Sequence, residues 1–342
     1  MKWHHVCNLA VDRNLNVYNF NNIAMRKFIL FFGMLAFIAC CSIVTAQISG
    51  GEEPPGEPVK VYFSPDLERV VTASISAFSE DHPTIRIQGA SLEDLANDAW
   101  FSDEVDLALV KEDYLGGLRP EDVRLTVLGR EAFIPVMNPA NPCLERIRET
   151  GITPGEFARA FTSGESVTWG NIAGNECREM VNAYRINDDS FMSYLAEFTG
   201  NDVSQIGGHV KKECKHVMEA LQEEKLGVGF CTLAQLMDLQ KTGDAEGVVM
   251  IPVDRNENKT MDHFENIYKD VDALARGIWI GKYPAALFSK IYAVSKKGTQ
   301  PGDADAFLHW MVTNGQKVMA DNGFSGLLEH EQGTILANMY AA

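Results

Sequence analysis

Residues 59–112 alternate between short apolar runs and amphipathic segments, and this alternation limits the fold more than any other feature of the chain. Val59–Phe63, Thr84–Ile87 and Val105–Val110 have the length and composition of β-strands. The segments between them have helical patterns, with the second helix expected over Leu92–Trp100. The order β-α-β-α-β predicts an α/β architecture in which helices cover a parallel sheet.

The first helix has a clear start signal. Ser64 is a good N-cap residue, and Pro65 suits the first helical position because its missing N–H would have no partner there. His82-Pro83 is expected to end this helix. The first strand therefore leads directly into a helix N-terminus.

The rest of the chain continues to alternate. We expect strands over 123–128, 132–136, 179–185, 228–231 and 287–294, and helices over 153–161, 190–198 and 210–224. A last helix is expected to begin with Asp303 or Asp305 as its N-cap and to end at Asn322-Gly323. Thr153 and Pro154 predict the same start as Ser64-Pro65.

The N-terminus has the features of an export signal. Met25-Arg26-Lys27 precedes an apolar run over 28–44, and small residues lead to Ala46. This pattern is typical of a secretory signal peptide that is cleaved near Ala46. Two alternatives stay open, a lipoprotein modified at Cys40 and an uncleaved membrane anchor. Residues 1–46 are thus interpreted as an upstream extension plus signal peptide, with Met25 as the true start, and the protein as exported to the periplasm or the outer face of a membrane.

Residues 47–58 are rich in Gly, Pro and Glu and have almost nothing to bury, so they predict a flexible linker. The whole chain has 30 Lys and Arg against 47 Asp and Glu, a formal charge of −17. Such an acidic surface repels phosphate backbones, which excludes nucleic acid as an expected partner.

Four cysteines follow the leader, and their spacing does not determine how many disulfides they form. In an exported chain they allow no disulfide, one or two, with three complete connectivities; they are Cys143, Cys177, Cys214 and Cys231. Cys214-Lys215-His216 together with His209 could hold a metal ion, but a mixed polar helix face explains them more simply. We expect no metal site and no cofactor.

Six segments, in order, resemble the phosphate-type substrate-binding proteins of ABC transporters, in the type II periplasmic binding protein superfamily. They are Ala132–Pro142 (AFIPVMNPANP), Ile152–Ile172 (ITPGEFARAFTSG, then VTWGNI), Tyr184–Phe191 (YRINDDSF), Leu226–Phe230 (LGVGF), Tyr283–Val294 (YP, then KIYAV) and Phe307–Phe324 (FLHWMV, GQK, then NGF). Together they span most of the chain after the linker.

The resemblance implies a two-lobed α/β fold of mostly parallel sheets, with a cleft and two hinge strands. Lobe one would comprise 59–134 and 290–342, and lobe two 135–289. It further implies a monomer that captures a small anion, phosphate or a related oxyanion, by hinge motion. The anion would be delivered to the membrane component of an ABC transporter or to another envelope protein.

The resemblance also places the anion site. Such clefts bind oxyanions through N–H groups at helix N-termini, together with hydroxyl and cationic side chains. The residues that match are Ser64, Leu67, Lys111, Arg185, Asn187, Asp188 and Ser190. Three simpler roles stay open: Ser64 as an ordinary N-cap, Lys111 as a surface lysine, and Arg185 as a partner of Asp188.

One departure from the family weakens the phosphate assignment. Asp188-Asp189-Ser190 stands where the family has Ser-Gly-Thr, and two carboxylates there repel a dianion. The departure leaves a different solute open as the ligand. The alternative is a binding-protein fold that has lost its small ligand and acts as an envelope interaction or scaffold protein.

An enzyme is not expected. The chain lacks the G-x-S-x-G, G-x-x-x-x-G-K-[ST] and H-E-x-x-H motifs, and it has no G-x-G-x-x-G within a β-α unit. We therefore assign no catalytic residue.

Overall fold

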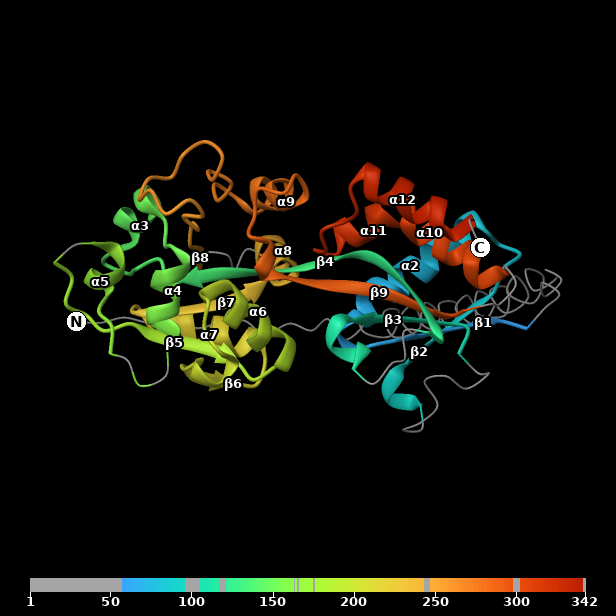
Figure 1. Cartoon of the computed structure of the whole chain (residues 1–342), viewed down its shortest axis with the longest axis horizontal. Helices are drawn as coiled ribbons and strands as arrows, with labels where there is room; N and C mark the ends of the chain where they lie inside the picture. The colour runs from blue at the N-terminus through green and yellow to red at the C-terminus, as the bar shows by residue number, and fades with distance from the viewer. Residues whose placement is uncertain are drawn as a thin grey trace, which may run out of the picture. The chain divides into compact units, whose positions relative to one another are not determined.

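The computed structural model describes residues 57–95, 105–116, 121–162, 164, 166–174, 176–242, 247–297 and 302–340 (Figure 1). The predicted signal peptide and nearly all of the linker lie outside the described residues. In the described part of the chain, no helix combines the length and the apolar character needed to cross a bilayer.

Lobe one is built on the predicted segment 59–112, but the second of its expected helices differs from the prediction. Only the short 3₁₀ helix η2 (Leu92–Asp94) forms there, Leu95 is extended, and 96–100 lie outside the described residues. The lobe's parallel strands β1 (Val59–Phe63), β2 (Ile87–Ser91) and β3 (Leu107–Lys111) have β1 in the centre. The helices of this lobe are α2 (Glu68–Asp81), α10 (Asp303–Val312), α11 (Gly315–Asp321) and α12 (Glu329–Tyr340). Strand β2 begins at Ile87, later than predicted, because Ile85 N–H still donates to His82 O in the preceding turn.

Lobe two contains β5 (Asn182–Ile186), β6 (His209–Lys211), β7 (Gly227–Thr232) and β8 (Val249–Met250), with β5 parallel to both β6 and β7. Its helices are α3 (Leu144–Thr150), α4 (Pro154–Phe161), α5 (Trp169–Ala173), α6 (Asp189–Thr199), α7 (Cys214–Glu223), α8 (Leu233–Thr242) and α9 (Val271–Trp279).

Two long antiparallel strands connect the lobes, β4 (Val123–Met137) and β9 (Phe288–Lys296), which lie side by side in Figure 1. Strand β9 pairs with β3 of lobe one, and β4 pairs with β7 of lobe two. The two strands predicted over 123–128 and 132–136 are therefore one strand. A bulge between Val127 and Gly129 keeps both halves paired with β9.

Each lobe has its own apolar core. The core of lobe one contains Phe78, Leu109 and Phe307, whereas the core of lobe two contains Trp169 and Phe230. Parallel pairing is confined to the outer strands of each lobe, and the hinge strands pair antiparallel with their neighbours.

Two further helix predictions were wrong in their bounds. The helix expected over 210–224 begins only at Cys214, because Val210 pairs with Arg185 in β6. The last predicted helix is two helices, broken after Val312. The second of these helices, α11, begins at Gly315. A Cβ there would lie 2.8 Å from the ring of Trp310, so only glycine fits beside that ring.

The capping predictions had mixed outcomes. Thr153 is the N-cap of α4 and forms a capping box with Glu156, as its sequence predicts. Gly302, rather than either aspartate, is the N-cap of α10, and Asp305 accepts a hydrogen bond from its N–H at 3.3 Å. Ser64 precedes the short 3₁₀ helix η1 (Pro65–Leu67), but its side chain makes no capping hydrogen bond.

Candidate functional site

The carboxyl ends of β1 and β3 lie together because the two strands are parallel neighbours, and ligands of α/β sheets bind at such edges. Ser64 follows β1 and is fully buried; among the described residues, its hydroxyl has no hydrogen-bond partner. The N–H of Leu67 is already occupied by Ser64 O at 2.9 Å, and its side chain lies in the core of lobe one. Leu67 therefore does not offer its N–H to a ligand in this conformation.

Lys111 ends β3 and is surrounded by carboxylates. Its ammonium forms ion pairs with Asp66 and with Glu131, the latter at 2.8 Å. Burial by itself lowers the pKa of Lys111, but the carboxylates of Glu131, Asp188 and Asp113 outweigh burial and raise that pKa. We call Lys111, Asp66, Glu131 and Asp188 the Lys111 cluster. Lys111 is thus a largely buried, charged group and not an ordinary surface lysine.

Arg185 is held by acceptors of its own lobe. Its guanidinium donates to Gly207 O at 3.1 Å and to Ile186 O and Asn187 Oδ1, both at 3.3 Å. Asp188 instead accepts the N–H of Phe191 at 2.7 Å as the N-cap of α6. Asp188 thus lies within electrostatic range of Lys111, whereas Arg185 binds Asn187 and the main-chain carbonyls of Gly207 and Ile186.

A cavity of about 900 Å³ has walls from both lobes, and we call it the interlobe cavity. Ser190 lines it together with other residues of α6. Further walls come from Glu112 and Asp113 in lobe one, from the hinge-strand residues Arg130 and Lys290, and from lobe-two residues that include Arg255 and Trp279. Of the predicted site residues, only Ser190 lines this cavity.

One direct hydrogen bond joins the lobes beside this cavity. Tyr194 of α6 donates its O–H to Glu112 Oε2 at 2.6 Å, and Tyr292 of β9 donates to Glu112 Oε1 at 3.4 Å. Burial, followed by the hydrogen bond to Glu112, raises the pKa of Tyr194. The cavity is therefore bounded by a polar contact that any opening of the lobes must break.

Two of these residues were missed by the sequence analysis. Glu131 is buried in β4 directly before the apolar run Ala132–Met137, and a carboxylate next to such a run was a usable signal. Glu112 directly follows β3, where polar residues of α/β proteins meet ligands.

None of the four described cysteines forms a disulfide, so none of the three connectivities is present. Cys214, the first residue of α7, lies within electrostatic range of the Lys111 cluster. Burial, and then the charge of Glu131, raises the pKa of its thiol to about 12. In the part of the chain that the structure describes, no three His, Cys, Asp or Glu residues converge as a metal-binding group.

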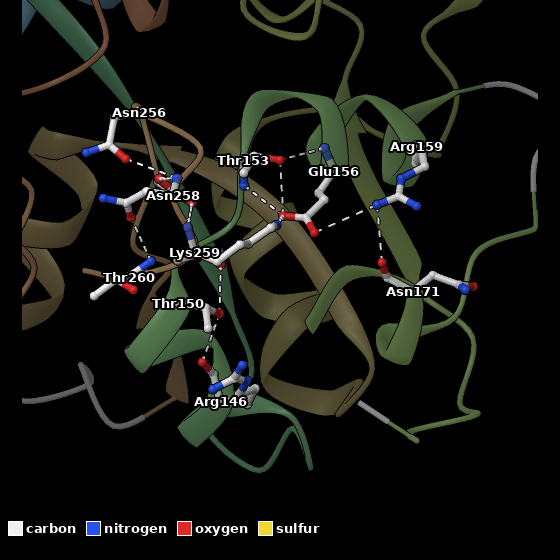
Figure 2. A network of polar contacts seen from close by, with 12 residues as sticks. Arg146, Thr150, Thr153, Glu156, Arg159, Asn171, Asn256, Asn258, Lys259 and Thr260 are labelled. Atoms are coloured by element: carbon white, nitrogen blue, oxygen red, sulfur yellow. Dashed lines mark hydrogen bonds and ion pairs between the residues drawn. The ribbon is translucent and has the colours of Figure 1, made fainter. Parts of the chain in front are cut away.

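Arg255 brings a further loop to the interlobe cavity. Its guanidinium donates to Lys282 O at 2.7 Å and to Gly281 O at 3.5 Å. The same loop reaches α4, where Lys259 forms an ion pair with the capping-box residue Glu156 (Figure 2).

No protein-family model and no curated protein matches this sequence. Several solved structures share its fold. A possible phosphate binding protein from Planctomyces limnophilus matches with 12% identity and a TM-score of 0.50, over 83% of this chain and 98% of that chain. PstS from Borrelia burgdorferi matches with 15% identity and a TM-score of 0.54, over 80% of this chain and 100% of that chain.

A putative phosphate ABC transporter substrate-binding protein from Clostridium perfringens, solved with bound phosphate, matches with 12% identity and a TM-score of 0.54. The match covers 80% of this chain and 100% of that chain. At such identities the likeness establishes the fold and leaves the ligand open. The chain has the type II periplasmic-binding-protein fold.

Proposed function

We propose that this protein is an exported solute-binding protein that captures a small oxyanion in its protonated form and delivers it to a membrane transporter. The observation that carries the proposal is the Lys111 cluster at the carboxyl edge of lobe one. It places one largely buried ammonium donor directly beside the carboxylate acceptors Asp66 and Glu131. The fold supports the proposal, because solutes of such proteins bind between two closing lobes. The Lys111 cluster does not itself line the interlobe cavity, whose wall begins at the neighbouring residues Glu112 and Asp113.

A protonated oxyanion matches this pairing of donor and acceptors. Hydrogen phosphate offers charged oxygens to Lys111 and a P–OH group that can donate to Asp66. An oxyanion without a proton has nothing to donate and meets the repulsion of the carboxylates. Two like charges 4 Å apart repel by about 4 kcal/mol in the environment of a protein surface. The cluster therefore favours hydrogen phosphate over sulfate.

Calorimetric titration of the chain from residue 47 with phosphate and with sulfate tests this proposal. We expect heat with phosphate and no heat with sulfate. Phosphate should bind at both pH values but less tightly at pH 8 than at pH 6, because monohydrogen phosphate, which prevails at pH 8, has one negative charge more and one P–OH group fewer to offer to the carboxylates than dihydrogen phosphate. Asp66→Asn should weaken phosphate binding by about tenfold, the equivalent of 1.4 kcal/mol. Glu149→Gln, on the exposed end of α3, is the matched control and should bind like the wild type.

The anion loop provides a second arm of the experiment. Asp188→Ser with Asp189→Gly removes two carboxylates, while the new hydroxyl at position 188 keeps an oxygen able to cap α6. This variant should bind phosphate more tightly than the wild type. Equal heats with phosphate and sulfate would contradict the need for a ligand proton.

A second function is favoured by a specific observation. Lys111 already has two carboxylate partners, and Arg185 is satisfied by carbonyl oxygens, so both predicted cationic groups are occupied without a ligand. This arrangement suits an envelope interaction or scaffold protein that has no small ligand. Absence of heat with phosphate, in the wild type and in the variant with the altered anion loop, would favour it.

A further inference from the structure

The loop between Val253 and α9 has a spacing of oxygen-bearing residues that the proposed function does not use. Residues 254–265 read DRNENKTMDHFE. Positions 1, 3, 5, 7, 9 and 12 of this stretch are Asp254, Asn256, Asn258, Thr260, Asp262 and Glu265. This is the ligand spacing of the twelve-residue calcium loop, D-x-[DN]-x-[DN]-G-x₅-E, with Lys259 in place of the glycine.

The backbone takes the shape that this spacing needs. Lys259 has φ +61°, the left-handed conformation for which calcium loops use glycine at position six, and Glu257 has φ +59°. Asp254 accepts the N–H groups of Asn258 and Lys259 at 3.2 and 2.8 Å. The loop therefore turns back on its own first residue. Figure 2 shows two further hydrogen bonds within it, in which Asn256 Oδ1 accepts the N–H of Asn258 and Asn258 Oδ1 accepts the N–H of Thr260.

The last residue of the pattern supplies independent evidence. Glu265 is only 4% exposed, and its Oε1 accepts the N–H groups of Arg255 and Asn256 at 2.7 and 3.0 Å. These bonds place the carboxylate inside the loop. The other oxygen, Oε2, is buried and has no hydrogen-bond partner among the described residues. A buried carboxylate oxygen without a partner is costly, and a bound cation would compensate for it.

The local charges are also unbalanced. Asp254 is fully buried, and the described residues contain no ion pair from Asp254, Asp262 or Glu265 to a basic side chain. The two basic residues of the loop have other partners: Lys259 pairs with Glu156, and Arg255 donates to main-chain carbonyls. Three carboxylates thus share one loop without a counter-ion from the protein.

We propose that residues 254–265 form a Ca²⁺ site. The side-chain ligands would be Asp254, Asn256, Asn258, Asp262 and Glu265, with the main-chain carbonyl of Thr260 at position seven. Among the described residues no three His, Cys, Asp or Glu side chains converge on one point, so a bound ion would have to draw the three carboxylates of the loop together, with amide and main-chain oxygens completing its shell. An all-oxygen set of this kind suits Ca²⁺, whereas Zn²⁺ prefers nitrogen and sulfur ligands.

The site would also act on the interlobe cavity. Arg255 is position two of the loop and lines that cavity, where its guanidinium is anchored to Gly281 and Lys282. A cation in the loop would fix the backbone from which Arg255 extends. The calcium proposal does not depend on the proposed oxyanion ligand.

The test is calorimetric titration of the EDTA-treated chain from residue 47 with CaCl₂, and separately with MgCl₂. We expect Ca²⁺ binding with a Kd between about 10⁻⁵ and 10⁻³ M, and weaker Mg²⁺ binding because Mg²⁺ demands a stricter geometry. Glu265→Gln should weaken Ca²⁺ binding at least tenfold. Glu257→Gln, which changes a loop residue outside the ligand pattern, is the matched control and should bind as the wild type does.

A gain-of-affinity variant keeps the proposal testable if Glu265→Gln fails to fold. Asn258→Asp adds a ligand charge and should tighten Ca²⁺ binding severalfold. No heat and no shift in Tm with CaCl₂ up to about 10 mM, beyond the range of extracellular calcium modules, would overturn the proposal. Unchanged Ca²⁺ affinity in a folded Glu265→Gln variant would overturn it equally.

Discussion

Two acidic clusters of this protein differ in how their carboxylates are compensated. In the Lys111 cluster, a largely buried ammonium lies between Asp66 and Glu131, so the chain supplies its own cation. In the loop 254–265, Asp254 and Glu265 are as buried as Glu131, yet the described residues give them only N–H donors. The carboxylates of the Lys111 cluster thus have a cation supplied by the protein, whereas the carboxylates of the loop 254–265 have none among the described residues.

The difference separates two kinds of binding. A ligand of the Lys111 cluster must exchange places with a carboxylate or share a proton with one, which makes binding selective and dependent on pH. A cation entering the loop displaces no ion pair of the protein. The cationic residues expected to bind a ligand, Lys111 and Arg185, therefore already have partners in the protein, whereas the carboxylates of the loop without any predicted role have no cation among the described residues.

Removal of the cation from the first cluster should have the largest effect. Lys111→Met leaves two carboxylates without their partner, Glu131 almost fully buried, and should lower the free energy of unfolding by about 3 kcal/mol or more. Urea denaturation measures the loss. Lys290→Met, which changes a half-exposed lysine 3.9 Å from Glu112, is the control and should stay within about 0.5 kcal/mol of the wild type. Equal losses in the two variants would show that Lys111 does not compensate the cluster.

Chelation of calcium should have the next largest effect. A ligand at 100 times its Kd stabilises the native state by about 2.7 kcal/mol, so EDTA should lower the Tm of the calcium-loaded chain by roughly 5 °C. Scanning calorimetry with and without excess CaCl₂ measures the shift. Lys111→Met should show the same calcium-dependent shift as the wild type, because it changes only the other cluster. Disappearance of this shift in Lys111→Met would mean that the cation binds at the Lys111 cluster and not in the loop 254–265.

The sequence predicted the α/β layers and several starts of elements, because apolar periodicity and the Thr153-Pro154 cap are local signals. It could not predict that 123–137 is one strand, since continuous pairing with β9 depends on residues far along the chain. At the site it identified Lys111 but not Glu131, which approaches Lys111 from a different strand. The calcium-type spacing was readable, but Lys259 at the glycine position obscured it.

The pH dependence of stability should separate the clusters further. The pKa of Lys111 is raised in the folded state, so the protonated lysine contributes stability that is complete below its unfolded pKa, about 10.4. This contribution is lost as pH rises from there through the folded pKa. Urea denaturation between pH 8 and pH 11 should show a decline that is steeper in the wild type than in Lys111→Met. Identical declines would contradict the raised pKa.

The smallest expected effect concerns the backbone of the loop. Glu257 has φ +59°, which costs a residue with a Cβ about 1 kcal/mol and costs glycine almost nothing. Glu257→Gly therefore removes strain but adds freedom to the unfolded chain, and the net gain in unfolding free energy should be about 0.5 kcal/mol. The variant keeps all the proposed ligands, so it should bind Ca²⁺ at least as tightly as the wild type.

Gly174→Ala makes the opposite change at φ +67°, the left-handed C-cap of α5, and should lose about 1 kcal/mol of unfolding free energy. Urea denaturation of both variants in EDTA measures how the backbone conformation changes the free energy of unfolding, without any contribution from a bound cation. Destabilisation by Glu257→Gly in EDTA would show that the loop keeps its left-handed turns for a reason other than the cation it is proposed to hold.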